Sequence, residues 1–253
     1  MKINDLYFAV CFFGVLLMFS TCKKDDRVLL ADYYYPSSTL DSGMVYEYQS
    51  FRNGQAFEKD YWYYRNIRDG DQLFLVGQNY GSNFFPTQFV REEILPSGSL
   101  LREAFLLESP DSTGIQEKVM FDVKQNNVYP FSVKDTLSVF LYEIQFSQME
   151  DVLLNYNIIR NRRYLGQTNY NFQGNAFDCA VFEIKELIEI ESEGVQSLEF
   201  RGKEYYAKDI GMVYQIKAMG DNVQEMKLED RYGMEKFEEM AFKQMQELGS
   251  RMK

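Results

Sequence analysis

Apolar and polar residues alternate with a period of two along much of the chain, a pattern typical of a strand with one buried face. The apolar positions are Phe140, Tyr142, Ile144 and Phe146 in one segment, Phe182, Ile184, Ile188 and Ile190 in a second, and Met212, Tyr214 and Ile216 in a third. Glu186 and Leu187 interrupt the second pattern, so we expect a bulge or bend there. An apolar face opposite a charged face predicts an antiparallel sheet that is wetted on one side.

Turn-forming residues separate such strand-like segments at Asn53-Gly54, Asp69-Gly70 and Pro96-Ser97-Gly98. Asn-Gly and Asp-Gly favour the left-handed turns that match the twist of paired strands. Because the connections are short, we expect each strand to pair with the next along the chain.

Two segments depart from the alternation. From Met234 onward, apolar residues recur at spacings of three and four, at Phe237, Ala241, Met245 and Leu248. This stripe predicts an amphipathic helix over about residues 234–249, packed on the sheet or, alternatively, bound to a partner. In Gln148–Asn155, acidic residues precede an apolar run, and we expect a helical turn.

These patterns predict a mainly β chain: a curved antiparallel meander sheet, open or barrel-like, with a C-terminal amphipathic helix. No Pro-rich or Ser-rich linker divides the chain after its first 30 residues, and only 5 Pro are present. We therefore expect a single β-rich domain over residues 31–253.

Residues 1–21 have the layout of a secretory signal peptide. Lys2 precedes an uncharged, largely apolar run from Leu6 to Thr21. This run is shorter than the roughly 20 apolar residues that a membrane-spanning helix needs, which disfavours the alternative of a transmembrane anchor.

The motif Phe19-Ser20-Thr21-Cys22 resembles the lipobox of bacterial lipoproteins, with an apolar residue, two small residues and the Cys that receives lipid. The resemblance implies cleavage before Cys22, lipid on its sulfur and an acyl chain such as palmitate on its amine, with residues 22–30 as a lipidated tether. Lys23-Lys24-Asp25-Asp26 looks like the surface-export signal of some Gram-negative lipoproteins. It implies an outer-membrane protein at the cell surface; a solvated linker on the periplasmic face is the alternative.

Composition narrows the chemistry. The 253 residues include no His, which excludes Ser-His-Asp and Cys-His sites and His-ligated metals. A net charge of −11 argues against nucleic acid as a partner. No phosphate loop or Cys-x-x-Cys motif occurs, so we expect no cofactor and no metal. Cys179 is the only Cys after Cys22, and we expect it to be a buried small hydrophobe.

Tyr61-Trp62-Tyr63-Tyr64 is the densest aromatic run of the chain. In a strand, Tyr61 and Tyr63 face one way, and Trp62 and Tyr64 face the other. One face serves the core, while the other packs under a loop or offers a surface for a sugar ring or a partner protein. These four residues are the candidate ligand-binding site.

Two charged groups are weaker candidates. The catalytic acid pair of a hydrolase could come from neighbouring predicted strands, which carry Glu92, Glu93, Glu103 and Glu108. With 38 acidic residues in the chain, some acids are close together by chance, and we expect these four to lie on a solvated face. The run Arg160-Asn161-Arg162-Arg163 could touch lipid phosphate or an acidic partner, but a charged outer strand edge is the expected outcome.

Two segments resemble β-rich bacterial lipoproteins of unknown function. Residues 204–213, from Glu204-Tyr205-Tyr206-Ala207 to Gly211-Met212-Val213, are similar to their closing hairpin. Tyr33-Tyr34-Tyr35-Pro36, followed by residues 43–48, is similar to their opening strand. The resemblance implies a curved antiparallel sheet with a helix, and it implies no chemistry.

Three functions follow from these features. The first is a lipid-anchored, non-catalytic envelope protein that binds a protein or glycan partner at the outer membrane. The second is a periplasm-facing carrier or chaperone for lipid or another apolar ligand, which the 12 Met and many aromatic residues favour. The third is a carboxylate-based hydrolase, for which the chain shows no catalytic motif.

Overall fold

The structure is a computed structural model, and it describes residues 26–108, 116–149 and 153–251. The predicted signal peptide and the predicted lipid site at Cys22 lie outside the described residues. Lys23, Lys24 and Asp25 of the predicted export signal lie outside them as well, and Asp26 is exposed.

Long antiparallel strands make up most of the described chain. The main sheet consists of β2 (Met44–Arg52), β3 (Gln55–Asp69), β4 (Gln72–Tyr80), β5 (Pro86–Leu95), β6 (Gly98–Glu108), β7 (Glu117–Met120), β8 (Asp122–Pro130), β10 (Val139–Met149), β11 (Leu153–Phe172), β12 (Asn175–Glu191), β13 (Val195–Ala207), β14 (Gly211–Met219) and β15 (Asn222–Tyr232). A separate pair is formed by β1 (Val28–Leu29) and β9 (Ser132–Val133), and a 3-10 helix, η2 (Ala31–Tyr33), follows β1.

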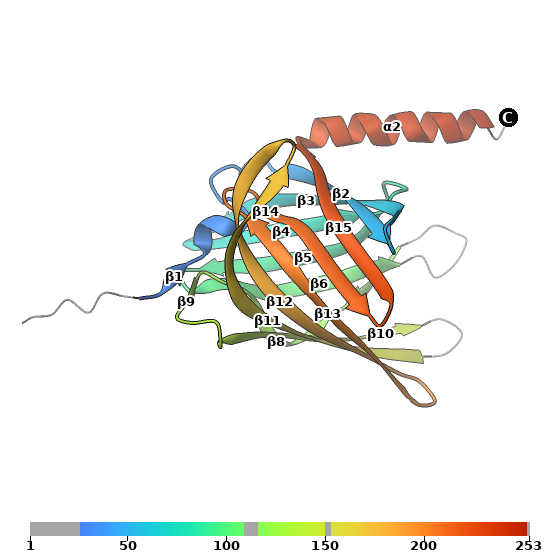
Figure 1. Cartoon of the computed structure of the whole chain (residues 1–253). Coiled ribbons are helices and arrows are strands. Elements are labelled where there is room, and N and C mark those ends of the chain that lie inside the picture. Colours follow the sequence, from blue (N-terminus) through green and yellow to red (C-terminus); the bar gives the residue numbers. More distant parts are fainter. Residues whose placement is uncertain (1–25, 109–115, 150–152, 252–253) are drawn as a thin grey trace, which may run out of the picture.

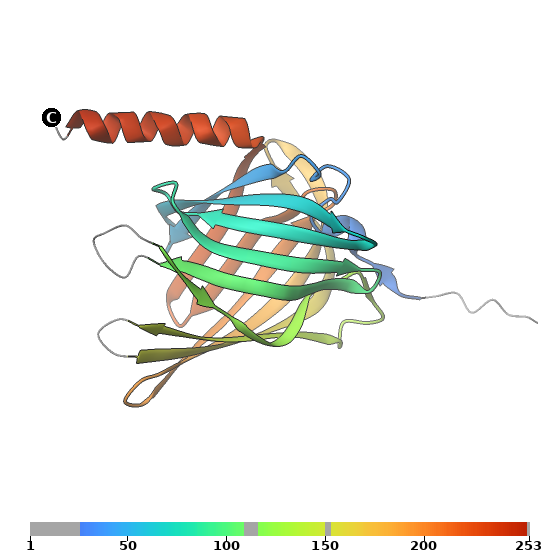
Figure 2. The ribbon, with the colours of Figure 1, turned by 180° about the vertical axis from the view of Figure 1, so that it is seen from behind.

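The main sheet closes on itself as an antiparallel barrel of twelve strands, with β7 as a short addition beside β6. Successive hairpins join β2 to β5 and β10 to β15, β15 pairs with β2, and β6 pairs with both β5 and β8. Figures 1 and 2 show the two sides of this barrel. The predicted mainly β meander is confirmed, and the sheet is closed.

The predicted turns join the strands as expected. Asn53 and Gly54, with φ values of 50° and 79°, form the left-handed turn between β2 and β3. Gly70, with a φ of 58°, lies between β3 and β4. Such turns match the right-handed twist of the strands, which is why these neighbours pair.

Three local expectations are wrong. The segment 148–155 is strand in its described part, because β10 and β11 remain paired up to Met149 and Leu153. No bulge occurs at Glu186, which keeps a regular register with both neighbouring strands. A register shift beside β14 places Met212 and Tyr214 on opposite faces, so the third predicted stripe is broken.

Residues 30–43, which we call the N-terminal plug, fill one end of the barrel. Leu30 is fully buried and Tyr34 is 3% exposed. The backbone N–H of Asp209 donates to Asp32 O at 2.8 Å, which ties the β13–β14 turn to the plug. Just before the plug, β1 lies within the predicted tether but pairs with β9.

The two segments that resemble the lipoprotein family meet at the plug. β13 ends at Ala207 and β14 begins at Gly211, which is the predicted closing hairpin. The rings of Tyr34 and Tyr206 have centroids 6.3 Å apart. A Cβ on Gly211 would lie 2.6 Å from the ring of Tyr35, so only glycine lets the plug pack this closely.

The C-terminal helix α2 (Met234–Arg251) lies outside the barrel wall (Figure 1). Phe237 is 3% exposed and packs on Tyr61, with ring centroids 5.4 Å apart. Farther along, Phe242 and Met245 are 60% and 57% exposed. The predicted helix is confirmed, but its apolar residues contact the wall mainly in its first half. Within the described ranges, no helix is long and apolar enough to cross a membrane.

Candidate functional site

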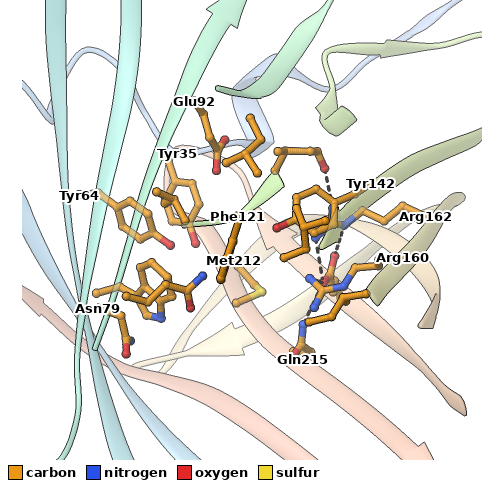
Figure 3. A pocket seen from close by; sticks show the side chains of 18 of the residues that line it. Tyr35, Tyr64, Asn79, Glu92, Phe121, Tyr142, Arg160, Arg162, Met212 and Gln215 are labelled. Atoms are coloured by element: carbon orange, nitrogen blue, oxygen red, sulfur yellow. Dashed lines mark hydrogen bonds and ion pairs between the residues drawn. The ribbon is translucent and has the colours of Figure 1, made fainter. Parts of the chain in front are cut away.

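The interior of the barrel contains a cavity of about 480 Å³. Trp62 and Tyr64 of β3 line one wall, and Arg160 and Arg162 of β11 line another. These residues reach the same space because alternate residues of each strand point into the barrel. Figure 3 shows Tyr64 across the cavity from Arg160.

An ion-pair network covers the cavity wall formed by β11, β12, β13 and β14. Arg162 donates from Nε to Glu204 Oε2 at 2.7 Å and from Nη2 to Glu204 Oε1 at 3.3 Å. Arg160 pairs through Nε and Nη2 with Glu186, and Lys217 Nζ lies 2.7 Å from the other oxygen of Glu186. Three cations therefore share two carboxylates.

The network holds both carboxylates in their ionised form. Burial alone would raise their pKa values, because it disfavours the charged form. Arg160 and Lys217 outweigh burial at Glu186, and Arg162 and Arg160 outweigh it at Glu204, so that each pKa falls to about 2. Both acids are therefore negatively charged at neutral pH.

Gly202 lets the network cross three strands. In the register of β12, β13 and β14, it lies between Ile184 and Lys217. A Cβ at this position would lie 1.8 Å from Ile216 O, so no other residue fits without moving a strand. The missing side chain leaves room for Lys217 to reach Glu186 on β12.

A separate acid, Glu92, lines the cavity beside the N-terminal plug. The hydroxyls of Tyr34 and Ser99 both donate to its Oε2 atom. Burial raises the pKa of Glu92, and these two hydrogen bonds and the charge of Arg162 partly offset the effect. Because Tyr34 belongs to the plug, this hydrogen bond fastens the plug to β5.

The predicted aromatic site is divided between the two faces of β3, as the alternation predicts. Trp62 and Tyr64 are stacked inside the barrel, with ring centroids 5.6 Å apart. Tyr61 is 4% exposed and lies under Phe237 of α2. Tyr63 is half-buried on the same outer face. The outer face is therefore covered at Tyr61, and the ring surface open to a small molecule is inside the cavity.

The acidic candidates do not converge on one cleft. Glu92 and Glu93 are neighbours on β5 and point to opposite sides of the wall. Glu93 lies with Glu103 in a hollow on the outer surface, where Arg102 Nε donates to it at 2.7 Å. Glu108 is half-buried at the end of β6. The expected solvated face is wrong for Glu92 and Glu93, which are both 7% exposed.

The basic run at residues 160–163 is not at a strand edge, because β11 lies between β10 and β12. Arg160 and Arg162 point into the barrel, where they pair with acids. Only Arg163 points outward to an ion pair, at 2.8 Å from Glu183. The expectation of an outer edge is therefore wrong.

The interior network was missed at the level of sequence, although a signal for it exists. Arg160 and Arg162 occupy the same alternate positions as Ile158, and Glu186 continues the stripe of Ile184 and Ile188. A charge within an apolar stripe requires an opposite charge from another strand. Opposite charges in the stripes of β11 and β12 therefore indicate an interior ion pair.

Cys179 is fully buried, and burial raises the pKa of its thiol to about 11. It is the small buried hydrophobe that the sequence predicts. Among the residues that the structure describes, no group of three or more His, Cys, Asp or Glu is arranged to hold a metal ion.

Comparison with known proteins shows a shared fold. No family model and no curated protein matches the chain. A candidate lipoprotein from Parabacteroides distasonis is 13% identical, with a TM-score of 0.51 over 79% of this chain and 98% of that chain. A candidate exported protein with a YmcC-like fold from Bacteroides fragilis is 11% identical, with a TM-score of 0.52 over the same shares of the two chains. The chain thus has the fold of these two solved structures.

Proposed function

We propose that this chain is a lipid-anchored, non-catalytic protein of the outer membrane that binds a small, partly apolar molecule inside its barrel. The observation that carries the proposal is the cavity of about 480 Å³, in which the stacked rings of Trp62 and Tyr64 face the ion-paired wall at Arg160. Small-molecule sites are typically concave and mostly apolar, with a few polar groups that orient the ligand.

The proposed anchoring rests on the resemblance of residues 19–22 to a lipobox, and the candidate lipoprotein and exported protein of the same fold support it. The six Cα-to-Cα steps from Cys22 to Val28 span at most about 22 Å. Lipid on Cys22 would thus keep the plugged end of the barrel close to the membrane. The export-like residues 23–26 favour the outward face of the outer membrane.

Binding can be measured through Trp62, the only Trp of the chain. We expect the Cys22→Ser chain, purified without detergent, to bind the neutral dye N-phenyl-1-naphthylamine saturably, with energy transfer from Trp62. Met212→Phe should weaken dye binding because Met212 lines the cavity. Met245→Phe is the matched control, since Met245 is exposed on α2. Absence of saturable binding, or equal binding by both variants, would contradict the proposal.

A glycan is the second candidate ligand, because the half-buried ring of Trp62 offers a stacking surface inside the cavity. Displacement of the dye by soluble mono- and oligosaccharides, but not by apolar molecules, would favour the glycan. A protein partner of the envelope is favoured instead if Tyr63→Ala on the outer face abolishes capture of that partner.

The membrane face can be tested by protease treatment of intact cells. We expect protease to remove the wild-type barrel domain from unbroken cells, with the Cys22→Ala chain as the control that cannot receive lipid. A domain that is protected until the outer membrane is broken would place the protein on the periplasmic face and contradict the surface assignment.

A further inference from the structure

We propose that the molecule bound in the cavity carries an anionic group, a carboxylate or a phosphate, that binds to Arg160; this inference rests on the proposed function. It starts from charge balance in the interior network. Arg160, Arg162 and Lys217 share only Glu186 and Glu204. One positive charge on this wall is left uncompensated, and a buried charge without a partner is costly.

Arg162 is not the cation that would accept a ligand. Its Nε and Nη2 atoms are bound to Glu204, and its Nη1 donates to the backbone carbonyl of Val128 at 2.7 Å. The side chain is 6% exposed. All three nitrogens of its guanidinium group are therefore occupied.

The Nη1 atom of Arg160 is available to donate hydrogen bonds to a ligand. Its Nε and Nη2 atoms are both directed at Oε2 of Glu186. Its Nη1 lies 3.8 Å from Glu204 Oε1, beyond hydrogen-bond distance, and makes no hydrogen bond within the described part of the chain. The Arg160 side chain is 23% exposed, more than those of Lys217 and Arg162. Arginine nitrogens with this freedom are suited to carboxylate and phosphate oxygens.

Two further carboxylates line the cavity, but they do not compensate Arg160. Glu92 accepts hydrogen bonds from two hydroxyls, and Asp60 accepts one from Ser50 at 3.1 Å. Neither forms an ion pair among the residues described here. Asp60 comes from β3, on the opposite side of the barrel from β11, so it would repel an anion there and favour its placement at Arg160.

The remainder of the cavity suits an apolar body. Phe121 and Met212 lie between the two walls in Figure 3. Ile158 occupies the inward position next to Arg160 along β11, and Met226 lines the cavity from β15. An amphiphile of moderate length, with an apolar chain against these residues and an anionic head at Arg160, matches this arrangement. Such a head could be that of a fatty acid or of a phosphate-bearing lipid.

Four probes with one apolar chain test the head group: dodecanoate, dodecyl phosphate, dodecanol and dodecylamine, each below its micelle concentration. We expect the Cys22→Ser chain to bind dodecanoate or dodecyl phosphate at least about tenfold more tightly than dodecanol, with dodecylamine weakest. Affinity is measured by dye displacement and by Trp62 emission. Tighter binding of dodecanoate points to a fatty acid, and tighter binding of dodecyl phosphate points to a phosphate-bearing lipid.

Variants then assign the preference to Arg160. Arg160→Gln should remove the advantage of the anions over dodecanol, and Arg160→Lys should retain part of it. Arg163→Gln is the matched control, because Arg163 points to the outside of the same strand. Thermal unfolding of each variant shows whether the barrel remains folded. If an Arg160 variant does not fold, the head-group preference is still tested, because the four probes are compared on the Cys22→Ser chain with Arg160 in place.

Dodecanol binding as tightly as dodecanoate and dodecyl phosphate would overturn the anionic ligand and leave the proposed function standing. An anion preference that persists in a folded Arg160→Gln variant would overturn the role of Arg160. Absence of binding by all four probes, together with no dye uptake, would overturn the proposed function itself.

Discussion

The guanidinium group of Arg162 on β11 and the carboxylate of Glu204 on β13 are joined inside the barrel by hydrogen bonds of 2.7 Å and 3.3 Å, with side chains 6% and 1% exposed. Their strands are not neighbours, because β12 lies between them. Gln215 donates to Glu204 Oε1 at 2.8 Å from β14. The pair thus ties together strands that the backbone hydrogen bonds connect only indirectly.

Breaking this pair is expected to be strongly destabilising. Arg162→Met leaves Glu204 charged and buried without its main partner, and it should lower the free energy of unfolding by about 3–5 kcal/mol. Urea denaturation at pH 7 measures the change. Arg163→Met, at a half-exposed ion pair with Glu183, should cost less than about 1 kcal/mol. Equal losses of unfolding free energy in the two variants would show that the interior pair stabilises the fold no more than the outer pair does.

The double variant Arg162→Met/Glu204→Leu separates the loss of the pair from the exposure of a lone charge. Replacing both partners with apolar residues removes the buried charge as well as its partner. We expect it to be more stable than Arg162→Met alone. A double variant less stable than the single variant would mean that Glu204, even without Arg162, stabilises the barrel through its remaining partners Arg160 and Gln215.

The free energy of unfolding should fall at low pH, because Glu186 and Glu204 become protonated and lose their ion pairs. Their pKa values are about 2 in the folded chain and near 4.5 when unfolded, so their contribution is complete above pH 4.5 and is lost as the pH falls toward 2. Each contributes on the order of 3 kcal/mol, since one pKa unit corresponds to about 1.4 kcal/mol. Glu92 acts in the opposite direction, because its raised pKa favours folding at lower pH.

Urea denaturation at several pH values between 7 and 2 tests this expectation. Glu204→Gln should be less stable at pH 7 and should show a shallower fall below pH 4.5. Glu183→Gln, which removes a carboxylate from a half-exposed ion pair on the outer face, is the matched control. An unchanged slope in Glu204→Gln would show that this carboxyl does not govern the acid transition.

Gly202→Ala should destabilise the barrel by about 1–3 kcal/mol, because the new methyl group would meet Ile216 O at 1.8 Å and force β13 from β14. Gly194→Ala is the matched control, since a Cβ on Gly194 meets nothing within 4 Å. Both variants are compared by thermal unfolding. Equal melting temperatures would mean that the two strands can separate at no cost.

The sequence predicts the strands, hairpins and helix because each depends on residues close together in the chain. Asn53-Gly54 and the stripe from Phe140 to Phe146 are local patterns, and both reappear in the structure. Closure of the barrel depends on β5 pairing with β6 on one side and β8 pairing with β6 on the other. That choice of partners is set by the whole sheet, and no short segment encodes it.

The candidate site was predicted only in part, because its charged wall also depends on residues that are far apart in the chain. The alternation correctly divides Trp62 and Tyr64 from Tyr61 and Tyr63, but it does not say which pair faces the interior. The charged wall was missed because Arg160 and Glu186 are 26 positions apart and each looks like a surface residue by itself. Only their shared position opposite each other on β11 and β12 makes them a pair.

The docking of α2 rests mainly on one residue. Phe237 is 3% exposed, and its ring centroid lies 4.8 Å from that of Tyr80 and 5.2 Å from that of Phe84. Phe237→Ala should cost about 3 kcal/mol of local stability and release α2 from the wall, since a buried Phe loses both its apolar contacts and its packing. Limited proteolysis should then cut within residues 234–251 while the barrel resists.

Phe242→Ala is the matched control on the same helix, because Phe242 is 60% exposed and its ring contacts no other aromatic ring in the described part of the chain. Its proteolysis pattern should equal that of the unmodified chain. Cutting of α2 at the same rate in both variants would mean that the helix is held elsewhere, for example by the ion pair of Lys236 with Asp230 at 2.9 Å. Both side chains of this ion pair are exposed, and an exposed ion pair contributes little to stability. We therefore expect the aromatic contacts of Phe237 to hold α2 in position.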